Sequence, residues 1–376
     1  MKFLFLCGSR GEWGYIRPII DLCKKKKIKY GICLTNMVLL DRYGNLAKSI
    51  KKKYSVIDEI EMSLEGNTHY SMTKSLAVFK INFIETLKRE KPNWLILAGD
   101  RGEQLMASIS AAYTYTPVCH IQAGERSGNI DGVARHAIAR FSHVHFASNK
   151  DAAERLSKTG EEKFRIFNVG APQLDEIKNK KITGLNAFKK KYEIDKLENF
   201  FLVVFHPVTE EYKNVEKNTK NFIKALNYFD NKKIWILPNN DAGSNYVRSI
   251  ILSKRKINNL IFDNLQREDY LALLKNCKLM IGNSSSGLLE APSFKKASVN
   301  VGNRQRDRVK AKSTINSTYD SNQIIHKIKY AKSMSFQKSL KKIKNPYGDG
   351  NSANRIIKIL LNIKTDEKFL TKKLIY

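Results

Sequence analysis

Short apolar runs alternate with stretches of helical periodicity along most of this chain. Each run is nearly continuous in apolar residues, as are strands of a parallel sheet that is covered on both faces. The alternation therefore predicts α/β domains with doubly wound, mostly parallel sheets. The runs that we expect to form strands are 3–7, 30–34, 56–60, 94–98, 118–121, 144–147 and 166–169, followed by 201–205, 234–237, 260–262, 279–281 and 298–301.

The pattern restarts in the middle of the chain, which predicts two domains. The length of 376 residues also exceeds that of one average domain. We expect a Rossmann-like domain at 1–170, a second one at 171–347 with a hinge at its start, and a helical tail at 348–376 that packs back across the junction. Ligands of open α/β sheets bind beyond the carboxyl ends of the strands, so the two domains are expected to face a cleft.

The chain is strongly basic, with 67 Lys and Arg against 36 Asp and Glu and a formal net charge of +31. Such an excess suggests a nucleic acid as partner. The lysines are, however, spread over helix faces and short runs, and the sequence contains no helix-turn-helix, zinc-finger or RNA-binding motif. We therefore expect no nucleic-acid partner and assign the functional part of the charge to anionic small-molecule substrates.

The five cysteines are scattered and form no Cys-x-x-Cys pair. This argues against a disulfide framework and against a zinc site. The sequence also lacks a run of roughly 18 apolar residues that could span a membrane and the pattern of a signal peptide. These features predict a cytoplasmic protein that contacts no membrane.

A loop of small residues follows the apolar run 279–281 and leads into a predicted helix. It reads Gly-Asn-Ser-Ser-Ser-Gly, and its hydroxyls, backbone N–H groups and helix dipole favour an anion such as phosphate. A carboxylate one turn further on suits the hydroxyls of a ribose. Taken alone, the loop is better explained as an ordinary serine N-cap followed by glycine. The charged motifs that follow the other strands favour a nucleotide site instead. The nucleotide-binding residues expected here are Ser284, Ser285, Ser286, Gly287 and Glu290.

Two charged motifs follow predicted strands of the first domain. Gly-Ser-Arg at 8–10 places Arg10 where it could contact a phosphate or a base, although a tight strand-to-helix turn explains the same residues. Its glycine spacing does not match the dinucleotide-binding fingerprint. Gly-Asp-Arg at 99–101 puts Asp100 and Arg101 directly after a buried run, where a charged pair indicates function.

The richest motif spans residues 120–136, from His120 to His136. It contains carboxylates, arginines and histidines close to a strand end, and Asp131, Arg135 and His136 lie near one another on one helix. Acid and base groups beside cations are what proton abstraction and departure of a leaving group require. An N-capping Asp131 that pairs with Arg135 inside the helix is the structural alternative.

Three further motifs follow predicted strands of the second domain. His206 begins a His-Pro-Val-Thr sequence, the segment 238–243 is a polar turn, and Arg304 lies in a cationic stretch after the run 298–301. A single histidine at a strand end is more often structural than catalytic, and only the expected location of His206 at the cleft makes the two interpretations equal. We interpret His143 and His145, which flank a strand start, as structural, and we find no convincing set of metal ligands.

The order of these motifs resembles that of the hydrolysing UDP-N-acetylglucosamine 2-epimerase family, in the branch that supplies sialic, legionaminic and related nonulosonic acids. The resemblance runs from Gly8 to about Arg308. It implies a glycosyltransferase-B-like fold and a reaction without metal or nicotinamide cofactor. In that family the C2 proton is removed while UDP leaves from C1, and water then adds to the glucal intermediate with inversion at C2. The implied partner is a nucleotide-sugar substrate, and a homodimer is possible.

The resemblance also assigns roles to individual residues. It implies that Asp100 and Asp131 are catalytic carboxylates, that His206 is the cleft histidine, and that Arg304 is a rim contact to sugar or phosphate. Many members carry a carboxylate at the position of Gln122, whose amide cannot act as a base, and Glu125 is the alternative source of charge. The remaining residues expected to bind nucleotide or substrate are Arg10, Arg101 and Arg135, together with the serine loop and Glu290.

Two other functions remain open from the sequence. A glycosyltransferase could use the same nucleotide seat with an acceptor in place of water. A nonenzymatic nucleic-acid binder is suggested by the net charge alone. The sequence also leaves open which 2-acetamido sugar is bound and whether the nucleotide is UDP or GDP.

Overall fold

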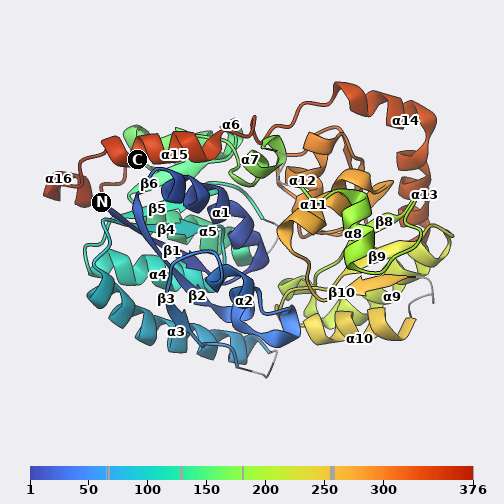
Figure 1. Ribbon diagram of the computed structural model, residues 1–376, viewed down its shortest axis with the longest axis horizontal. Helices are drawn as coiled ribbons and strands as arrows, with labels where there is room; N and C mark the ends of the chain where they lie inside the picture. The colour runs from blue at the N-terminus through green and yellow to red at the C-terminus, as the bar shows by residue number, and fades with distance from the viewer. Residues whose placement is uncertain (65, 67, 128–129, 180–181, 255–258, 376) are drawn as a thin grey trace. The chain divides into compact units, whose positions relative to one another are not determined.

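The computed structural model describes residues 1–376 apart from 65, 67, 128–129, 180–181, 255–258 and 376. The chain divides into two compact units (Figure 1), one made of Met1–Lys178 with Tyr347–Tyr376 and the other of Asn179–Pro346. The first unit thus extends beyond residue 170 and includes the segment that we expected to be a separate tail. Each unit is built on its own parallel sheet.

The sheet of the first unit has the strand order β3-β2-β1-β4-β5-β6-β7, and its neighbouring strands pair in parallel. The order changes direction between β1 and β4, which is the topological switch point of a doubly wound sheet. The strands are β1 (Lys2–Cys7), β2 (Lys29–Thr35), β3 (Val56–Ile60), β4 (Trp94–Ala98), β5 (Val118–Ile121), β6 (Val144–Ala147) and β7 (Ile166–Asn168).

Helices cover both faces of this sheet. Alternate residues of β1 point to opposite faces, so Phe3 and Phe5 belong to one core and Leu4 and Leu6 to another. This double burial explains why the strand reads as one apolar run. The helices are α1 (Arg10–Lys25), α2 (Leu46–Lys51), α3 (His69–Glu90), α4 (Gly102–Tyr113), α5 (Ile130–Phe141), α6 (Lys150–Lys158), α7 (Gln173–Lys178), α15 (Ser352–Asn362) and α16 (Glu367–Leu370).

The sheet of the second unit has the order β10-β9-β8-β11-β12-β13, again parallel. Its switch point lies between β8 and β11. The predicted fold class of two Rossmann-like α/β units is therefore confirmed. The elements are β8 (Phe201–Val204), β9 (Lys233–Ile236), β10 (Leu260–Phe262), β11 (Leu279–Gly282), β12 (Ser298–Val301), β13 (Thr314–Ser317), α8 (Leu185–Lys191), α9 (Val215–Asn227), α10 (Ser244–Lys254), α11 (Arg267–Asn276), α12 (Ser286–Leu289), α13 (Ser321–Lys332) and α14 (Met334–Ser339).

The predicted tail helix forms as α15 and packs against α1 and α7 of the first unit. The Asp175 carboxylate on α7 accepts hydrogen bonds from the backbone N–H groups of Ser352 at 2.9 Å and Ala353 at 2.7 Å. These are the N–H groups at the start of α15 that have no partner inside the helix. Asp175 thus caps the tail helix. The expected packing across the domain junction stays a prediction.

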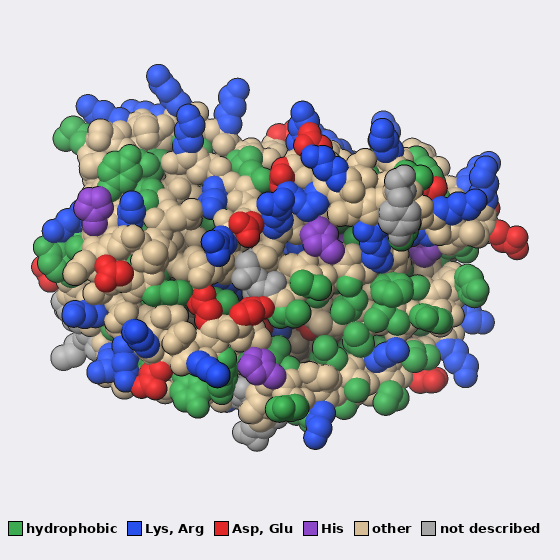
Figure 2. Space-filling model, turned by 180° about the vertical axis from the view of Figure 1, so that it is seen from behind, with side chains coloured by type: hydrophobic (Ala, Val, Ile, Leu, Met, Phe, Trp, Pro, Cys, Tyr) green, Lys and Arg blue, Asp and Glu red, His purple; other side chains and the backbone are tan. Residues whose placement is uncertain are grey.

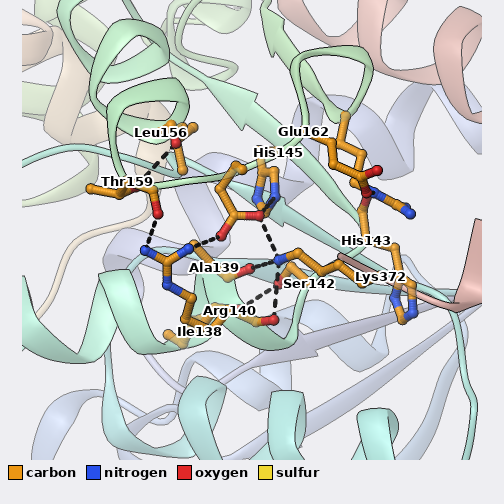
Figure 3. A network of polar contacts seen from close by, with 12 residues as sticks. Ile138, Ala139, Arg140, Ser142, His143, His145, Leu156, Thr159, Glu162 and Lys372 are labelled. Carbon is orange, nitrogen blue, oxygen red and sulfur yellow. Dashed lines mark hydrogen bonds and ion pairs between the residues drawn. The ribbon is translucent and has the colours of Figure 1, made fainter. Parts of the chain in front are cut away.

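A buried polar network holds the last residues of the chain against the first unit (Figure 3). The Lys372 ammonium donates to the carbonyls of Ala139 at 2.6 Å and Arg140 at 3.1 Å, and it pairs with Glu161 at 2.6 Å. Glu161 has no exposed surface and also contacts His145 Nε2 at 2.8 Å. The interpretation of His145 as structural agrees with these contacts.

Two observations bear on the predictions about nucleic acid and membranes. Figure 2 shows Lys and Arg side chains spread over the visible face without merging into one basic stripe. Within the described ranges, no helix is both long enough and apolar enough to cross a membrane.

We expect Glu161→Gln to lower the free energy of unfolding by about 3 kcal/mol at pH 7, because it leaves the Lys372 charge buried without its partner. Burial pulls the pKa of Glu161 upward, but the bond to His145 and the charges of His145 and Lys372 lower it from 4.5 to about 2. The carboxylate therefore contributes stability above pH 4.5 that is lost as the pH falls towards 2.

Urea denaturation at pH 7 and through this acidic window measures both effects. The variant should lose less stability on acidification than the wild-type protein. Glu154→Gln is the control, because Glu154 is an exposed partner of Lys150 at 3.6 Å and should change stability by less than about 0.5 kcal/mol. Equal stability of the Glu161 variant and the wild type at pH 7 would contradict the role given to the network.

Candidate active site

The sequence-predicted residues of the first unit lie in loops at the carboxyl edge of its sheet. Arg10 follows β1, Asp100 and Arg101 follow β4, and Gln122 and Glu125 follow β5. These three strands are neighbours in the sheet, in the order β1-β4-β5. The first two loops flank the switch point, where open α/β sheets bind their ligands.

Asp100 is held by a buried arginine from α5. Its carboxylate forms an ion pair with Arg135 and accepts a hydrogen bond from the Ser127 hydroxyl at 3.2 Å. Arg135 also donates to the backbone carbonyl of Gln122 at 2.8 Å. The Arg135 side chain is only 2% exposed and the Asp100 side chain 21%. The structure therefore brings Asp100 and Arg135 together and leaves part of the carboxylate accessible.

Asp131 lies in the first turn of α5 and is partly exposed. The structural alternative pairs it with Arg135, but the Arg135 guanidinium contacts Asp100. The motif residues Gly128 and Asn129 lie outside the described residues. His136 follows on the same helix, and burial together with the neighbouring Arg135 lowers the pKa of its imidazole.

Gln122 and Glu125 lie in the same loop but have different surroundings. Gln122 is buried, has a left-handed backbone with φ of 64°, and donates from its amide to Gln173 at 3.4 Å. The Glu125 carboxylate accepts a hydrogen bond from the Ser148 hydroxyl at the end of β6. Glu125 is thus placed beside β6, whereas Asp100 follows β4. A catalytic role for either Gln122 or Glu125 stays a prediction.

Arg10 is the first residue of α1, directly after a capped turn. The Ser9 hydroxyl accepts from the N–H of Glu12 at 3.3 Å, and the Glu12 carboxylate accepts from the N–H groups of Gly8 at 2.6 Å and Ser9 at 3.1 Å. This is a capping box. The tight turn proposed as the structural alternative is present, and it fixes the position of Arg10 at the start of α1. Glu12 was missed, although the Ser-x-x-Glu spacing could have indicated it.

A single asparagine joins three loops at the carboxyl edge of the second sheet. The Asn283 side chain donates to the carbonyl of His206 at 2.8 Å and accepts from the His206 N–H at 2.7 Å. The Asn283 carbonyl accepts from Arg304 at 3.3 Å and Gln305 at 3.1 Å. The loops after β8, β11 and β12 are thereby tied together at the switch point. Asn283 lies in the Gly-Asn-Ser-Ser-Ser-Gly loop that was predicted to bind an anion, but no role was predicted for Asn283 itself.

The residue before this asparagine has to be glycine. Gly282 has φ of 134°, and a Cβ atom there would lie 2.0 Å from the carbonyl oxygen of Val204 on the neighbouring strand. That separation is far inside van der Waals contact. The close approach of β8 and β11 brings Asn283 within reach of the loop that follows β8.

His206 is oriented by the polar turn that follows β9. Its Nδ1 accepts a hydrogen bond from the backbone N–H of Asn239 at 3.2 Å, and the residue is only 5% exposed. An accepting Nδ1 places the proton of a neutral imidazole on Nε2. The structure therefore brings His206 and the predicted turn 238–243 together and presents the ring as a donor through Nε2.

The helix that follows the serine loop is short. The helix α12 is a single turn, Ser286–Leu289, and its dipole is correspondingly small. An anion at this loop would depend on hydroxyls and individual N–H groups. Among the described contacts, the N–H groups of Ser286 and Gly287 bond to Ser284, and none engages the N–H groups of Ser284 or Ser285.

Glu290 takes part in a chain of polar side chains behind this loop. Its carboxylate pairs with Arg267 and accepts from the Ser286 hydroxyl at 2.5 Å. Tyr270 donates to the same hydroxyl at 2.7 Å. The sequence indicated neither Arg267 nor Tyr270, because both lie on α11, far from the motif along the chain. The expected ribose contact of Glu290 stays a prediction.

The described residues contain no group of three or more His, Cys, Asp and Glu side chains that could hold a metal ion. The five cysteines are all buried as free thiols.

We expect Asn283→Ala to lower the free energy of unfolding of the second unit by about 2–4 kcal/mol, because it leaves the buried N–H and carbonyl of His206 without partners. Chemical denaturation followed by tryptophan fluorescence measures the loss. Asn276→Ala is the matched control, since Asn276 is exposed and bonds only to Ala272 of its own helix among the described contacts. Equal stability of the two variants would contradict the bridging role of Asn283.

Comparison with known proteins places the chain in a family. A family model described as UDP-N-acetylglucosamine 2-epimerase matches residues 21–361. The chain is 34% identical to a Legionella pneumophila protein named UDP-N,N'-diacetylbacillosamine 2-epimerase (hydrolyzing), over 99% of this chain and 98% of that protein. It is 31% identical to a Campylobacter jejuni protein named GDP/UDP-N,N'-diacetylbacillosamine 2-epimerase (hydrolyzing), over 97% and 96% of the two chains.

The fold is also similar to a solved structure. A crystal structure of UDP-GlcNAc 2-epimerase from Neisseria meningitidis bound to UDP-GlcNAc superimposes with a TM-score of 0.80, covering 96% of this chain and 100% of that chain at 18% identity. Identity at this level shows a shared fold. The family model and the two relatives each cover most of the sequence. The chain therefore belongs to the UDP-N-acetylglucosamine 2-epimerase family and is an epimerase.

Proposed function

We propose that this protein is a hydrolysing 2-epimerase. It converts a UDP-linked 2-acetamido sugar, either UDP-N-acetylglucosamine or UDP-N,N'-diacetylbacillosamine, to the free 2-epimer and UDP. The observation that carries the proposal is the partly exposed carboxylate of Asp100, fixed at the switch point by a buried arginine. A fixed and accessible carboxylate suits proton abstraction from carbon.

The reaction balances in two steps. In the first step a base takes the C2 proton, the C–H electron pair forms a C1=C2 bond, and UDP leaves C1 with the electron pair of its bond. In the second step water adds across the double bond, with hydroxyl on C1 and a proton delivered to C2 from the opposite face. The sum is one water consumed, one UDP released and an inverted C2, without an oxidant or reductant.

In this proposal, two carboxylates of the first unit carry out the two proton transfers. Asp100 is the proposed base, and Arg135 and Ser127 hold its carboxylate in place. Asp131 is the proposed acid for the hydration step, since its partly exposed carboxyl lies at the start of the helix that carries Arg135. Gln122 has an amide, which neither gives nor takes a proton at neutral pH.

The second unit holds the nucleotide in this proposal. The serine loop and Arg304 bind the diphosphate, and His206 donates to it through Nε2. Donors that already point at the leaving group stabilise the charge that develops on it without reorganisation. Asn283 supports this arrangement, because it fixes His206 and Arg304 relative to the serine loop. We further propose that the enzyme works in the cytoplasm and supplies a mannosamine-type sugar for a nonulosonic acid such as sialic or legionaminic acid.

We expect the purified protein to release UDP from UDP-N-acetylglucosamine or UDP-N,N'-diacetylbacillosamine in deuterated water, with one deuterium at C2 of the free sugar. The label follows because the proton taken from C2 is replaced from solvent. Mass spectrometry and proton NMR of the product measure the label and the configuration at C2. A GDP-linked diacetylbacillosamine in the same panel tests the choice of nucleotide.

Asp100→Asn is the control, since it loses the base while the second unit is unchanged. It should bind UDP like the wild type and turn over at least about 1,000-fold more slowly. Nucleotide release that requires an added sugar acceptor would select a glycosyltransferase instead. Failure of the wild-type protein to release nucleotide from any of these sugars would refute the proposed function.

We also propose that the protein is a homodimer that pairs through the outer face of α3, α4 and α5. These helices lie side by side on one side of the first sheet, and Figure 2 shows apolar side chains gathered there. Ile81 on α3, Tyr113 on α4 and Val133 on α5 are 71%, 81% and 67% exposed. The one charged residue within α4 is Glu103, which is buried. Two copies with a net charge of +31 repel each other, so a face whose middle helix, α4, exposes no charged side chain suits their contact.

We expect the wild-type protein to sediment at twice its chain mass of 43.1 kDa and Ile81→Asp with Tyr113→Asp to sediment as a monomer, because two carboxylates would be buried at the contact. Analytical ultracentrifugation at micromolar concentration measures the mass. Tyr330→Asp is the control, since Tyr330 is 51% exposed on the second unit. A monomeric wild-type protein would refute the proposed dimer.

A further inference from the structure

Three side chains of the second unit form a chain of hydrogen bonds behind the serine loop. Tyr270 on α11 donates to the Ser286 hydroxyl at 2.7 Å, and Ser286 donates to the Glu290 carboxylate at 2.5 Å. The direction is determined, because a carboxylate only accepts and each hydroxyl carries one hydrogen. Burial and the negative charge of Glu290 raise the pKa of Tyr270, so its phenol keeps that hydrogen at neutral pH. The chain therefore runs from Tyr270 through Ser286 to Glu290.

The hydroxyl of Ser286 is committed by these two contacts. Its one hydrogen points to Glu290, and Tyr270 occupies one of its acceptor positions. A phosphate oxygen needs a donor, so in this arrangement Ser286 has no hydroxyl hydrogen to offer it. Ser286 is also buried, whereas Ser284 and Ser285 are only partly buried. The hydroxyl of Ser286 therefore differs in role from the other two hydroxyls of the serine loop.

The Glu290 carboxylate is fixed through both of its oxygens. Oε1 pairs with Arg267, and Oε2 accepts from Ser286. A carboxylate has about four acceptor positions, so each oxygen can accept again after these two contacts. The Glu290 side chain keeps 6% of its surface exposed. Two oxygens that are held in fixed directions and can each accept once more match the two adjacent hydroxyls of a ribose.

The helix that carries Tyr270 is itself held in place. The buried carboxylate of Asp269 contacts three side chains in and beside α8, which are Thr183 at 2.7 Å, Lys191 at 2.5 Å and Tyr192 at 2.9 Å. Tyr270 is the next residue on α11, and Arg267 begins the same helix. One anchored helix thus supplies both Arg267 and Tyr270, the groups that orient Glu290 directly and through Ser286.

We propose that Tyr270 is a positioning residue, which acts through Ser286 to hold the Glu290 carboxylate against the ribose of the nucleotide. The inference rests on the proposed 2-epimerase function, in which the second unit holds the nucleotide. Glu290 accepts from the two ribose hydroxyls, and the diphosphate is left to Arg304 and the other groups of the serine loop. Loss of the chain therefore costs affinity for a ribonucleotide much more than for its 2'-deoxy analogue, which lacks one of the two hydroxyls.

Calorimetric titration of the full-length protein with UDP and with 2'-deoxy-UDP tests this assignment. Wild-type protein should bind UDP at least about 30-fold more tightly, because the analogue leaves an acceptor of Glu290 unpaired. Tyr270→Phe and Ser286→Ala should each weaken UDP binding by about 10-fold and 2'-deoxy-UDP binding by less than about 2-fold. The double variant should lose no more than the larger single loss, because the two hydroxyls belong to one chain.

The matched control is Tyr330→Phe. It also removes a phenolic hydroxyl from the second unit, at a residue that is 51% exposed, and it should bind both nucleotides like wild type. Thermal unfolding of every variant shows that binding is measured on folded protein. A general loosening of the site would weaken both nucleotides, so the preference for ribose is the quantity that separates positioning from folding.

Equal losses for the two nucleotides would overturn the positioning role, and so would unchanged UDP affinity in both single variants. Unfolding of both single variants would make the chain purely structural and would also overturn it, as would a wild-type protein that does not prefer UDP to 2'-deoxy-UDP. These affinities are measured without turnover. A protein that shows the ribose preference and yet releases no nucleotide from any sugar nucleotide therefore loses the proposed function and keeps the positioning role.

Discussion

Burial of both sheet faces is the constraint on which the rest of this structure depends. Helices cover each face of the two parallel sheets, so the strand interiors carry mostly apolar side chains. Polar groups that serve chemistry are consequently displaced to the loops at the strand ends. The carboxyl edge of each sheet, next to the switch point, therefore collects the motifs, and the fold concentrates them before any individual contact is considered.

Within each unit, one or two buried side chains convert neighbouring loops into a single rigid surface. Arg135 and Glu103 do this in the first unit, and Asn283 does it in the second. Each of these residues bonds to backbone groups or side chains of loops that follow adjacent strands. A site made of loops becomes precise when buried hydrogen bonds of this kind fix it. The groups proposed to touch substrate, such as Asp100 and His206, are held by these residues.

Charged side chains are arranged differently on the surface and in the interior of the protein. The surface carries a large excess of Lys and Arg, whereas buried carboxylates occur beside specific cations, as in the pairs Glu161–Lys372 and Glu290–Arg267. A buried charge without a partner costs far more than an exposed one. Net charge therefore says little about the site, and the pairs that matter are found only in the folded chain.

The sequence by itself determined the fold class, the positions of most strands and the loops that carry polar motifs, because apolar periodicity is a local property. It failed at β13, whose residues Thr314–Ser317 include polar side chains at a sheet edge, and it did not indicate that α12 is a single turn, because a serine-rich loop does not encode helix length. Only the tertiary structure decided that Arg135 pairs with Asp100, that Glu290 pairs with Arg267 and that Asn283 joins three loops. Each of these contacts joins residues brought together by the packing of separate elements, and no local pattern records which of many possible partners lies within a few ångströms.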